Sequence, residues 1–276
     1  MYHYVRDEKK NKLKHLNFLN FKKFKDQINF FLKNFLIVNY EEFSDIIRNK
    51  KIYNKPPLVL TFDDGYIDHY KYVFPYLLKK KIKGLFYPPA KVIEKKFVLD
   101  VNKIQYILSI VKNKKIILQE IKQYLKKKTK INFDKLNINK INLKHRFDNK
   151  EIILIKRLLQ HFLPTNLRKD LNNHLFKRFS NFTLEDFSKQ LYMKKKHMIE
   201  MVNEGMHFGA HGNNHHWFQF ITKKQQELEI KKSVLFLKKI NKKNKLYLIC
   251  YPFGSYNNHT LKILKKYNFE LGFTSV

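Results

Sequence analysis

Two adjacent carboxylates, Asp63 and Asp64, follow an apolar run at residues 58–62 and lead into Gly65. Adjacent side chains at the end of a strand point to opposite sides, so one carboxylate can bind a metal ion while the other stays free as a general base. Taken alone, an Asp-Asp-Gly sequence is more typical of an ordinary turn or a helix cap. The pair becomes informative only together with further ligands.

His211 and His215 are the candidate partners of these carboxylates. They stand four residues apart after a second strand-like run, with Gly212 and two asparagines between them. Glycine and asparagine favour a turn over a helix, and either conformation lets both imidazoles converge on one ion. With Asp64 they form a set of two histidines and one carboxylate that leaves positions open for water and substrate. An isolated HxxxH sequence is more often a pair of surface histidines, so this interpretation depends on both motifs.

A third polar segment, residues 251–257 (YPFGSYN), follows an apolar run that ends at Cys250. Because Cys250 is the single cysteine, an intramolecular disulfide framework and a cysteine-based zinc cluster are excluded, which fits a reducing compartment. Nothing in the run would lower the pKa of this thiol. We therefore expect Cys250 to be a buried core residue and not a nucleophile.

The pattern along the chain predicts an α/β fold. Strand-like runs occur at residues 2–5, 35–39, 58–62, 84–88, 206–210, 246–251 and 270–274. Helical spacing lies between most of them, for example at residues 21–33 after an Asn20 cap, and in a helix that stops at Gly205. Seven such alternations predict a closed or nearly closed (β/α) barrel. Residues from about 100 to 192 show helical spacing without a strand, so we expect a single domain, 1–276, with a helical insertion.

The composition is strongly basic: 57 Lys and Arg residues against 23 Asp and Glu give a formal net charge of +34. Only six of the 57 are arginine, whereas recognition of bases and phosphates favours the arginine fork. We expect no specific nucleic-acid partner, although peripheral contact with an anionic membrane surface fits the charge. Apolar runs are too short to span a membrane and no apolar signal segment opens the chain, so a cytoplasmic, membrane-peripheral location is expected.

These motifs, in this order, resemble those of the polysaccharide deacetylases, the NodB-homology group or carbohydrate esterase family 4. Residues 61–65 (TFDDG) match the first motif in full. The second motif, H-[ST]-x-x-H-P, matches in its histidines only, because Gly212 and His216 replace the usual Ser or Thr and Pro. Residues 250–253 resemble the third motif, R-x-P-[YF], with Cys250 in place of the arginine that usually orients the base. In outline the resemblance extends over residues 2–4, 58–90 and 197–276, and is to members associated with lipopolysaccharide and capsule sugars.

The resemblance implies a distorted (β/α)7-type barrel, NodB-like, and a metal-dependent hydrolase. It implies removal of an N-acetyl group from an amino sugar of a surface-glycan precursor. In that reaction Asp63 would be the general base, and the Phe253 backbone N–H would bind the oxyanion. Asp64, His211 and His215 would hold a divalent metal ion, and we expect Zn²⁺.

The histidine that the family usually supplies near its C-terminus, as the acid, is absent after residue 259. The first and last strands of a barrel are neighbours, so we expect His3 to take its place. Related deacetylases that act on poly-N-acetylglucosamine open with a similar Tyr-His. A purely structural role for His3 is the alternative, and His69, His216 and His259 are weaker candidates for the acid.

Four aromatic residues near the motifs could stack on sugar rings, although core packing explains each of them at least as well: Tyr66, Tyr87, Trp217 and Tyr256. Three other classes of function remain open. The chain could be a catalytically inactive sugar-binding relative, a deformylase on the same scaffold, or a nucleic-acid-binding protein. The sequence does not determine the sugar, the acyl group, the metal or the oligomeric state.

Overall fold

The structure is a computed structural model that describes residues 1–10, 16–50, 52–95, 97–136, 148–241 and 247–274. The chain divides into two compact units. The larger consists of Met1–Lys14, Phe18–Phe97 and Ser188–Val276, and the smaller of Val98–Phe187 with His15–Asn17. Every residue of the three motifs belongs to the larger unit.

The strands of the larger unit are short and all their pairings are parallel. They are β1 (Val5–Arg6), β2 (Leu19–Asn20), β3 (Leu36–Ile37), β4 (Pro57–Leu58), β5 (Thr61–Asp63), β6 (Leu85–Tyr87), β7 (His207–Phe208), β8 (Tyr247–Cys250) and β9 (Phe269–Phe273). β1 pairs with β2, β3 with β4 and β8 with β9, while β5, β6 and β7 form a three-stranded sheet. Single bridges join Tyr2 to Phe62 and Ala210 to Ile249.

This arrangement confirms the predicted distorted (β/α) barrel. Each of the seven predicted runs contains a strand, although Leu246 at the start of one run lies outside the described residues. β2 was not expected, because two residues are too few to show an alternating pattern. The expectation that the first and last strands are neighbours is wrong for the strand pairings of the described residues. Tyr2 pairs with Phe62 of β5, β1 pairs with β2, and the last strand, β9, pairs with β8.

The helices of the larger unit are α1 (Phe21–Asn34), α2 (Tyr40–Asn49), α3 (Phe74–Lys79), α4 (Ala90–Glu94), α10 (Lys195–Asn203), α11 (Lys223–Ile240) and α12 (Asn258–Lys266). Four of the helices described in the larger unit, α1, α2, α11 and α12, begin at an Asn or Thr whose side chain caps the first turn. The Asn20 side chain accepts a hydrogen bond from the Lys22 N–H at 2.8 Å, which confirms the predicted cap of α1. Gly205 has a φ of 82° just after α10, a left-handed conformation that ends the helix as predicted.

Alternation along the strands separates two faces of the barrel wall. Phe62, Phe86, Phe208 and Ile249 belong to a large core cluster that also holds buried side chains of α1, α3, α10, α11 and α12. The residues between them, including Leu85, Tyr87, Leu248 and Cys250, form a second cluster on the inner face. Thr61 and Asp63 alternate with Phe62 on β5. Asp63 therefore lies on the inner face.

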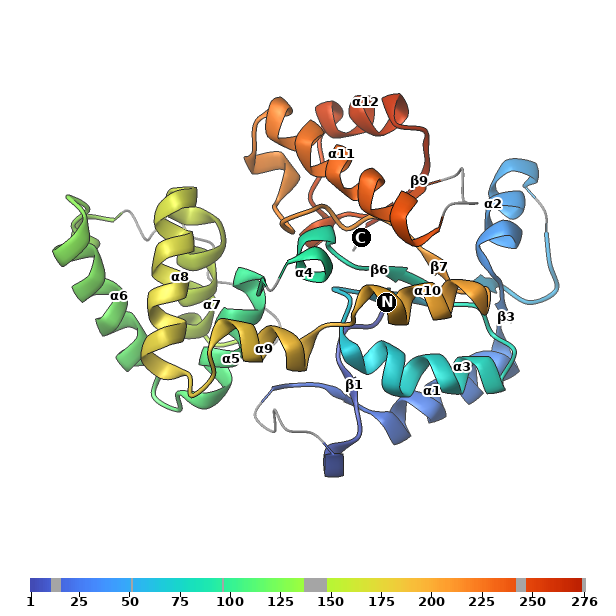
Figure 1. Cartoon of the computed structure of the whole chain (residues 1–276), viewed down its shortest axis with the longest axis horizontal. Coiled ribbons are helices and arrows are strands. Elements are labelled where there is room, and N and C mark those ends of the chain that lie inside the picture. Colours follow the sequence, from blue (N-terminus) through green and yellow to red (C-terminus); the bar gives the residue numbers. More distant parts are fainter. Residues whose placement is uncertain (11–15, 51, 96, 137–147, 242–246, 275–276) are drawn as a thin grey trace. The chain divides into compact units, whose positions relative to one another are not determined.

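The smaller unit is helical. It contains α5 (Asp100–Ile110), α6 (Lys114–Lys128), α7 (Lys150–Arg157), α8 (Thr165–Phe179) and the start of α9 (Leu184–Leu191) (Figure 1). Lys103 is buried in it, and its ammonium donates to Asp100 and Asn173 at 2.8 Å each, which compensates the buried charge. Residues 137–147 of the predicted insertion lie outside the described residues. Among the helices that the structure describes, none is both long and apolar enough to cross a membrane.

The packing of Tyr87 on the inner face can be tested by a substitution at Gly209. A Cβ on Gly209 would lie 2.7 Å from Cδ1 of Tyr87 and 2.8 Å from the Leu248 carbonyl oxygen, both closer than real contacts allow. We expect Gly209→Ala to lower the free energy of unfolding by about 1–3 kcal/mol, the usual cost of overpacking. Chemical denaturation measures this, and Tyr87→Leu in the same chain should restore part of the loss. Unchanged stability in Gly209→Ala would mean that the ring does not fill this space.

Candidate active site

Each of the three motifs enters the site through a turn with left-handed backbone. Asp64 has a φ of 70°, His215 a φ of 59° and Phe253 a φ of 58°. Left-handed conformations are unfavourable for residues with a side chain and occur disproportionately at functional sites. A glycine of positive φ accompanies each of the three turns: Gly65, Gly212 and Gly254. The turns follow the carboxyl ends of β5, β7 and β8, which is where parallel barrels carry their sites.

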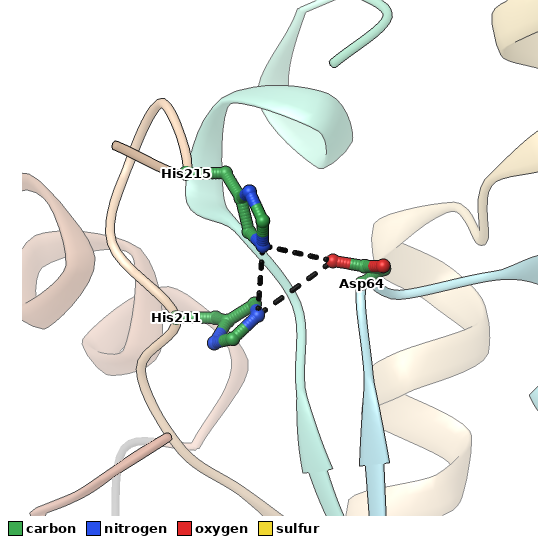
Figure 2. Close-up of side chains that lie close together, drawn as sticks. All are labelled: Asp64, His211 and His215. Atoms are coloured by element: carbon green, nitrogen blue, oxygen red, sulfur yellow. Dashed lines mark hydrogen bonds and ion pairs between the residues drawn. The ribbon is translucent and has the colours of Figure 1, made fainter. Parts of the chain in front are cut away.

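Asp64, His211 and His215 meet at one point, as Figure 2 shows. The Oδ1 atom of Asp64 lies 3.3 Å from Nε2 of His215 and 3.6 Å from Nε2 of His211. The two Nε2 atoms are 3.1 Å apart. One ligand atom from each residue therefore faces the others within 4.8 Å, a spacing at which one ion could contact all three.

Hydrogen bonds prepare these atoms for a cation. Nδ1 of His211 lies 2.6 Å from the Cys250 carbonyl oxygen, so it carries the proton and its Nε2 keeps a lone pair. Burial lowers the pKa of His215 to about 3, against the opposing effect of Asp64, so the His215 ring is neutral. Oδ2 of Asp64 accepts from the Tyr66 hydroxyl at 2.6 Å, whereas its buried Oδ1 has no hydrogen-bond partner among the described residues. Two lone pairs and one anionic oxygen fit a divalent cation such as zinc.

The two neighbouring carboxylates have opposite pKa shifts. Burial raises the pKa of Asp63, and the histidines and the Cys250 thiol only partly offset it. Burial acts in the same direction on Asp64, but His215, His3, His211 and the Tyr66 hydroxyl outweigh it, so the pKa of Asp64 is lowered. Asp64 thus favours the anionic form that a metal ligand needs, and Asp63 binds a proton more readily.

Glu229, a buried residue of α11 that holds the loop between the two histidines, was not predicted from the sequence. Its carboxylate accepts from the backbone N–H groups of Asn213 and Asn214 at 2.8 Å and 2.7 Å, and from the Asn214 side chain. A Cβ on Gly212 would lie 3.2 Å from the same carboxylate. The signal was a glutamate on the apolar side of a helix, next to the buried Ile230.

His3 lies beside the two carboxylates. The Tyr2 N–H donates to the Thr61 carbonyl at 2.8 Å, and the Asp63 N–H donates to the Tyr2 carbonyl at 2.9 Å, so residues 1–3 run along β5. The His3 side chain is exposed, and its charge affects the pKa values of Asp63 and Asp64.

The three alternative histidines are placed differently. His69 is fully buried with a pKa lowered by burial to about 4, and its Nε2 donates to the His3 carbonyl at 2.7 Å. His216 is half-buried next to His215, and His259 is exposed in the first turn of α12.

Two of the four aromatic candidates cannot stack on a sugar. Tyr66 and Tyr87 are fully buried, so their rings offer no surface to a sugar, and core packing is the alternative that the structure supports for them. Tyr66 instead orients Asp64, and Tyr87 packs on the inner face. Trp217 is half-buried and its ring stacks on Phe253 at 4.5 Å, while Tyr256 is 42% exposed and stacks on Tyr251.

One protein-family model matches part of this chain. Residues 169–272 match the family model described as polysaccharide deacetylase, a span that includes both histidines and Phe253. A sequence comparison with curated proteins gives no match.

Several solved structures share the fold over nearly the whole chain. A deacetylase from Streptococcus pyogenes, determined with acetate, is 20% identical with a TM-score of 0.58, and the alignment covers 100% of this chain and 81% of that one. The protein IcaB from Ammonifex degensii is 16% identical with a TM-score of 0.56, covering 99% and 81%. A de-N-acetylase from Aggregatibacter actinomycetemcomitans is 13% identical with a TM-score of 0.56, covering 99% and 85%.

The contribution of Glu229 to metal binding can be tested by substitution. We expect Glu229→Gln and Glu229→Ala to weaken the binding of Zn²⁺ about 10- to 100-fold, because the loop that carries both histidines loses the carboxylate that holds it. Competition with a chromophoric chelator measures the affinity, and circular dichroism checks the fold. Glu227→Gln is the matched control, since Glu227 on the same helix pairs with the exposed Lys266. Wild-type affinity in a folded Glu229→Ala protein would mean that the loop keeps its shape without this residue.

Proposed function

We propose that this chain, which matches the polysaccharide deacetylases in family model and in fold, is a metal-dependent hydrolase that removes an N-acetyl group from an amino sugar. The observation that carries the proposal is the convergence of Asp64, His211 and His215 beside a second, separately oriented carboxylate, Asp63. Such a set suits hydrolysis of an amide by an activated water.

The chain's own residues supply the proton transfers. When bound, a divalent ion, for which Zn²⁺ is our proposal, would polarise the acetyl carbonyl and lower the pKa of water. Asp63 accepts the proton of the attacking water, a role favoured by its raised pKa. The Phe253 N–H donates to the developing oxyanion, and the contact of the Phe253 ring with that of His215, 4.6 Å between centroids, supports this role.

His3 gives a proton to the departing amine in this proposal. Its position beside β5 supports the role, because that strand ends in Asp63 and Asp64 follows it directly. Its exposure also supports the role, since an acid must reach a substrate that enters from solvent.

The substrate is an N-acetylated sugar of a surface-glycan precursor. The pair of stacked rings of Trp217 and Phe253 next to His215, together with the exposed Tyr256, supports a site for a sugar ring. A nucleotide-linked or lipid-linked precursor carries phosphate, which suits the net charge of +34 and contact with an anionic membrane surface. We propose that the reaction takes place in the cytoplasm, where such precursors would be met. The single cysteine fits that reducing environment.

Acetate release tests this function. Purified protein loaded with Zn²⁺ is incubated with N-acetylglucosamine oligomers and with nucleotide-linked and lipid-linked N-acetyl sugars, and acetate and free amine are quantified in parallel. We expect equal amounts of both from at least one substrate. Formate release from N-formyl sugars alone would identify a deformylase, and stoichiometric metal without any hydrolysis would identify an inactive sugar-binding protein. Either result contradicts the proposal.

The roles of the two aspartates can be separated. We expect Asp63→Asn to keep its metal while turnover falls by about 100-fold or more, because the amide cannot accept the proton. Asp64→Asn should lose metal affinity and activity together, since the amide oxygen is a weaker ligand. Metal analysis and acetate release on both variants are the measurements. Metal loss in Asp63→Asn, with retention in Asp64→Asn, would reverse the assignment.

His3→Gln tests the acid. We expect bound metal and fold to be retained, with acetate release at least about 100-fold slower, the scale of general acid catalysis. Substrates with a more basic, poorer leaving amine should lose the most. His197→Gln is a control, because His197 stacks on Tyr70 on the outside of α10. Near wild-type turnover in His3→Gln would place the acid elsewhere.

A further inference from the structure

We infer that the thiol of Cys250 orients the carboxylate of Asp63 by donating a hydrogen bond to it across the interior of the barrel. This inference rests on the proposed function, in which Asp63 is the base. Cys250 is then a positioning residue, at the place where the motif that it resembles has an arginine.

The geometry that carries the inference is a single contact between two strands that are not neighbours. Sγ of Cys250 lies 3.3 Å from Oδ2 of Asp63, a hydrogen-bond distance for sulfur. Cys250 ends β8 and Asp63 ends β5, while β6 and β7 lie between them in the wall. The contact therefore crosses the inside of the barrel, directly below the site.

Both groups are shielded from water. Asp63 is 2% exposed and Cys250 is 4% exposed. Within the part of the chain that the structure describes, the second oxygen of Asp63, Oδ1, is buried without a hydrogen-bond partner. The thiol thus restrains one oxygen of the carboxylate and leaves the other free to accept a proton.

The thiol is the donor in this contact, because an ionised carboxylate offers only acceptor oxygens. The Cys250 backbone has a separate role, because its carbonyl accepts from Nδ1 of His211. Side-chain substitutions at Cys250 therefore remove the contact to the base without removing the contact to the ligand.

A kinetic comparison tests the role. Cys250→Ala and Cys250→Val lack the donor, and we expect kcat to fall about tenfold, the lower range for loss of a hydrogen bond to a charged group, with KM and bound Zn²⁺ unchanged. Cys250→Ser retains a donor and should keep kcat closer to wild type than either. Leu248→Val, two residues earlier on the inner face, controls for lost packing and should keep kcat. Equal kcat for the alanine, valine and serine variants would overturn the inference, as would a change in KM alone.

A second measurement is independent of activity. Because Cys250 is the single cysteine, the S–H stretching band in the infrared spectrum reports on this thiol alone, and Cys250→Ser supplies the blank. We expect Asp63→Asn to shift the band toward that of a weaker hydrogen bond, since a neutral amide replaces the carboxylate. An unshifted band overturns the inference. A shifted band in a protein that releases no acetate would leave the contact standing while the proposed function fails, so the two failures can be told apart.

Discussion

Burial of two adjacent carboxylates at the end of β5 is the constraint on which the rest of the site depends. Asp63 is 2% and Asp64 is 3% exposed, and a buried negative charge is costly unless it is compensated. The Tyr66 hydroxyl donates to Oδ2 of Asp64, and Oδ1 faces the Nε2 atoms of His211 and His215, where a bound cation would compensate the charge. For Asp63, the Cys250 thiol donates across the barrel. The barrel wall, its left-handed turns and its inner face all serve to bring these groups to one place.

The structure explains two positions, Gly212 and Cys250, at which this chain differs from the motifs of the polysaccharide deacetylases. Gly212, where Ser or Thr is usual, has a φ of 68°, a conformation that glycine adopts without strain. Its place beside the Glu229 carboxylate leaves little room for a side chain, and Glu229 holds the loop through two backbone N–H groups. Cys250 stands where the motif has an arginine, and its neutral thiol donates to the carboxylate of Asp63. The chain therefore has its own means of shaping the loop and of contacting the base.

The features that could be predicted from the sequence are those encoded locally. The alternation of apolar runs and helical spacing predicted the barrel, and the Asn20 cap and the Gly205 stop were readable from single residues. The pairing of Asp64 with His211 and His215 was predicted from motif order, and the structure brings the three together. Contacts that no motif marks could not be predicted: Glu229 lies 15 to 16 residues from the amides it binds, and the Cys250 thiol contacts Asp63, 187 residues away. For Tyr66 and Tyr87 the sequence left stacking on a sugar and core packing both open, and their complete burial decides for packing.

The most direct test of the account is reconstitution of the wild-type protein. Metal is removed with a chelator, and Zn²⁺ is returned in steps while bound metal and acetate release from an N-acetyl sugar are measured on the same samples. We expect negligible acetate release without metal. As Zn²⁺ is returned, activity should rise and saturate together with binding, at one ion per chain. Undiminished acetate release by the metal-free protein would contradict it, and so would binding of one ion with no gain in hydrolysis.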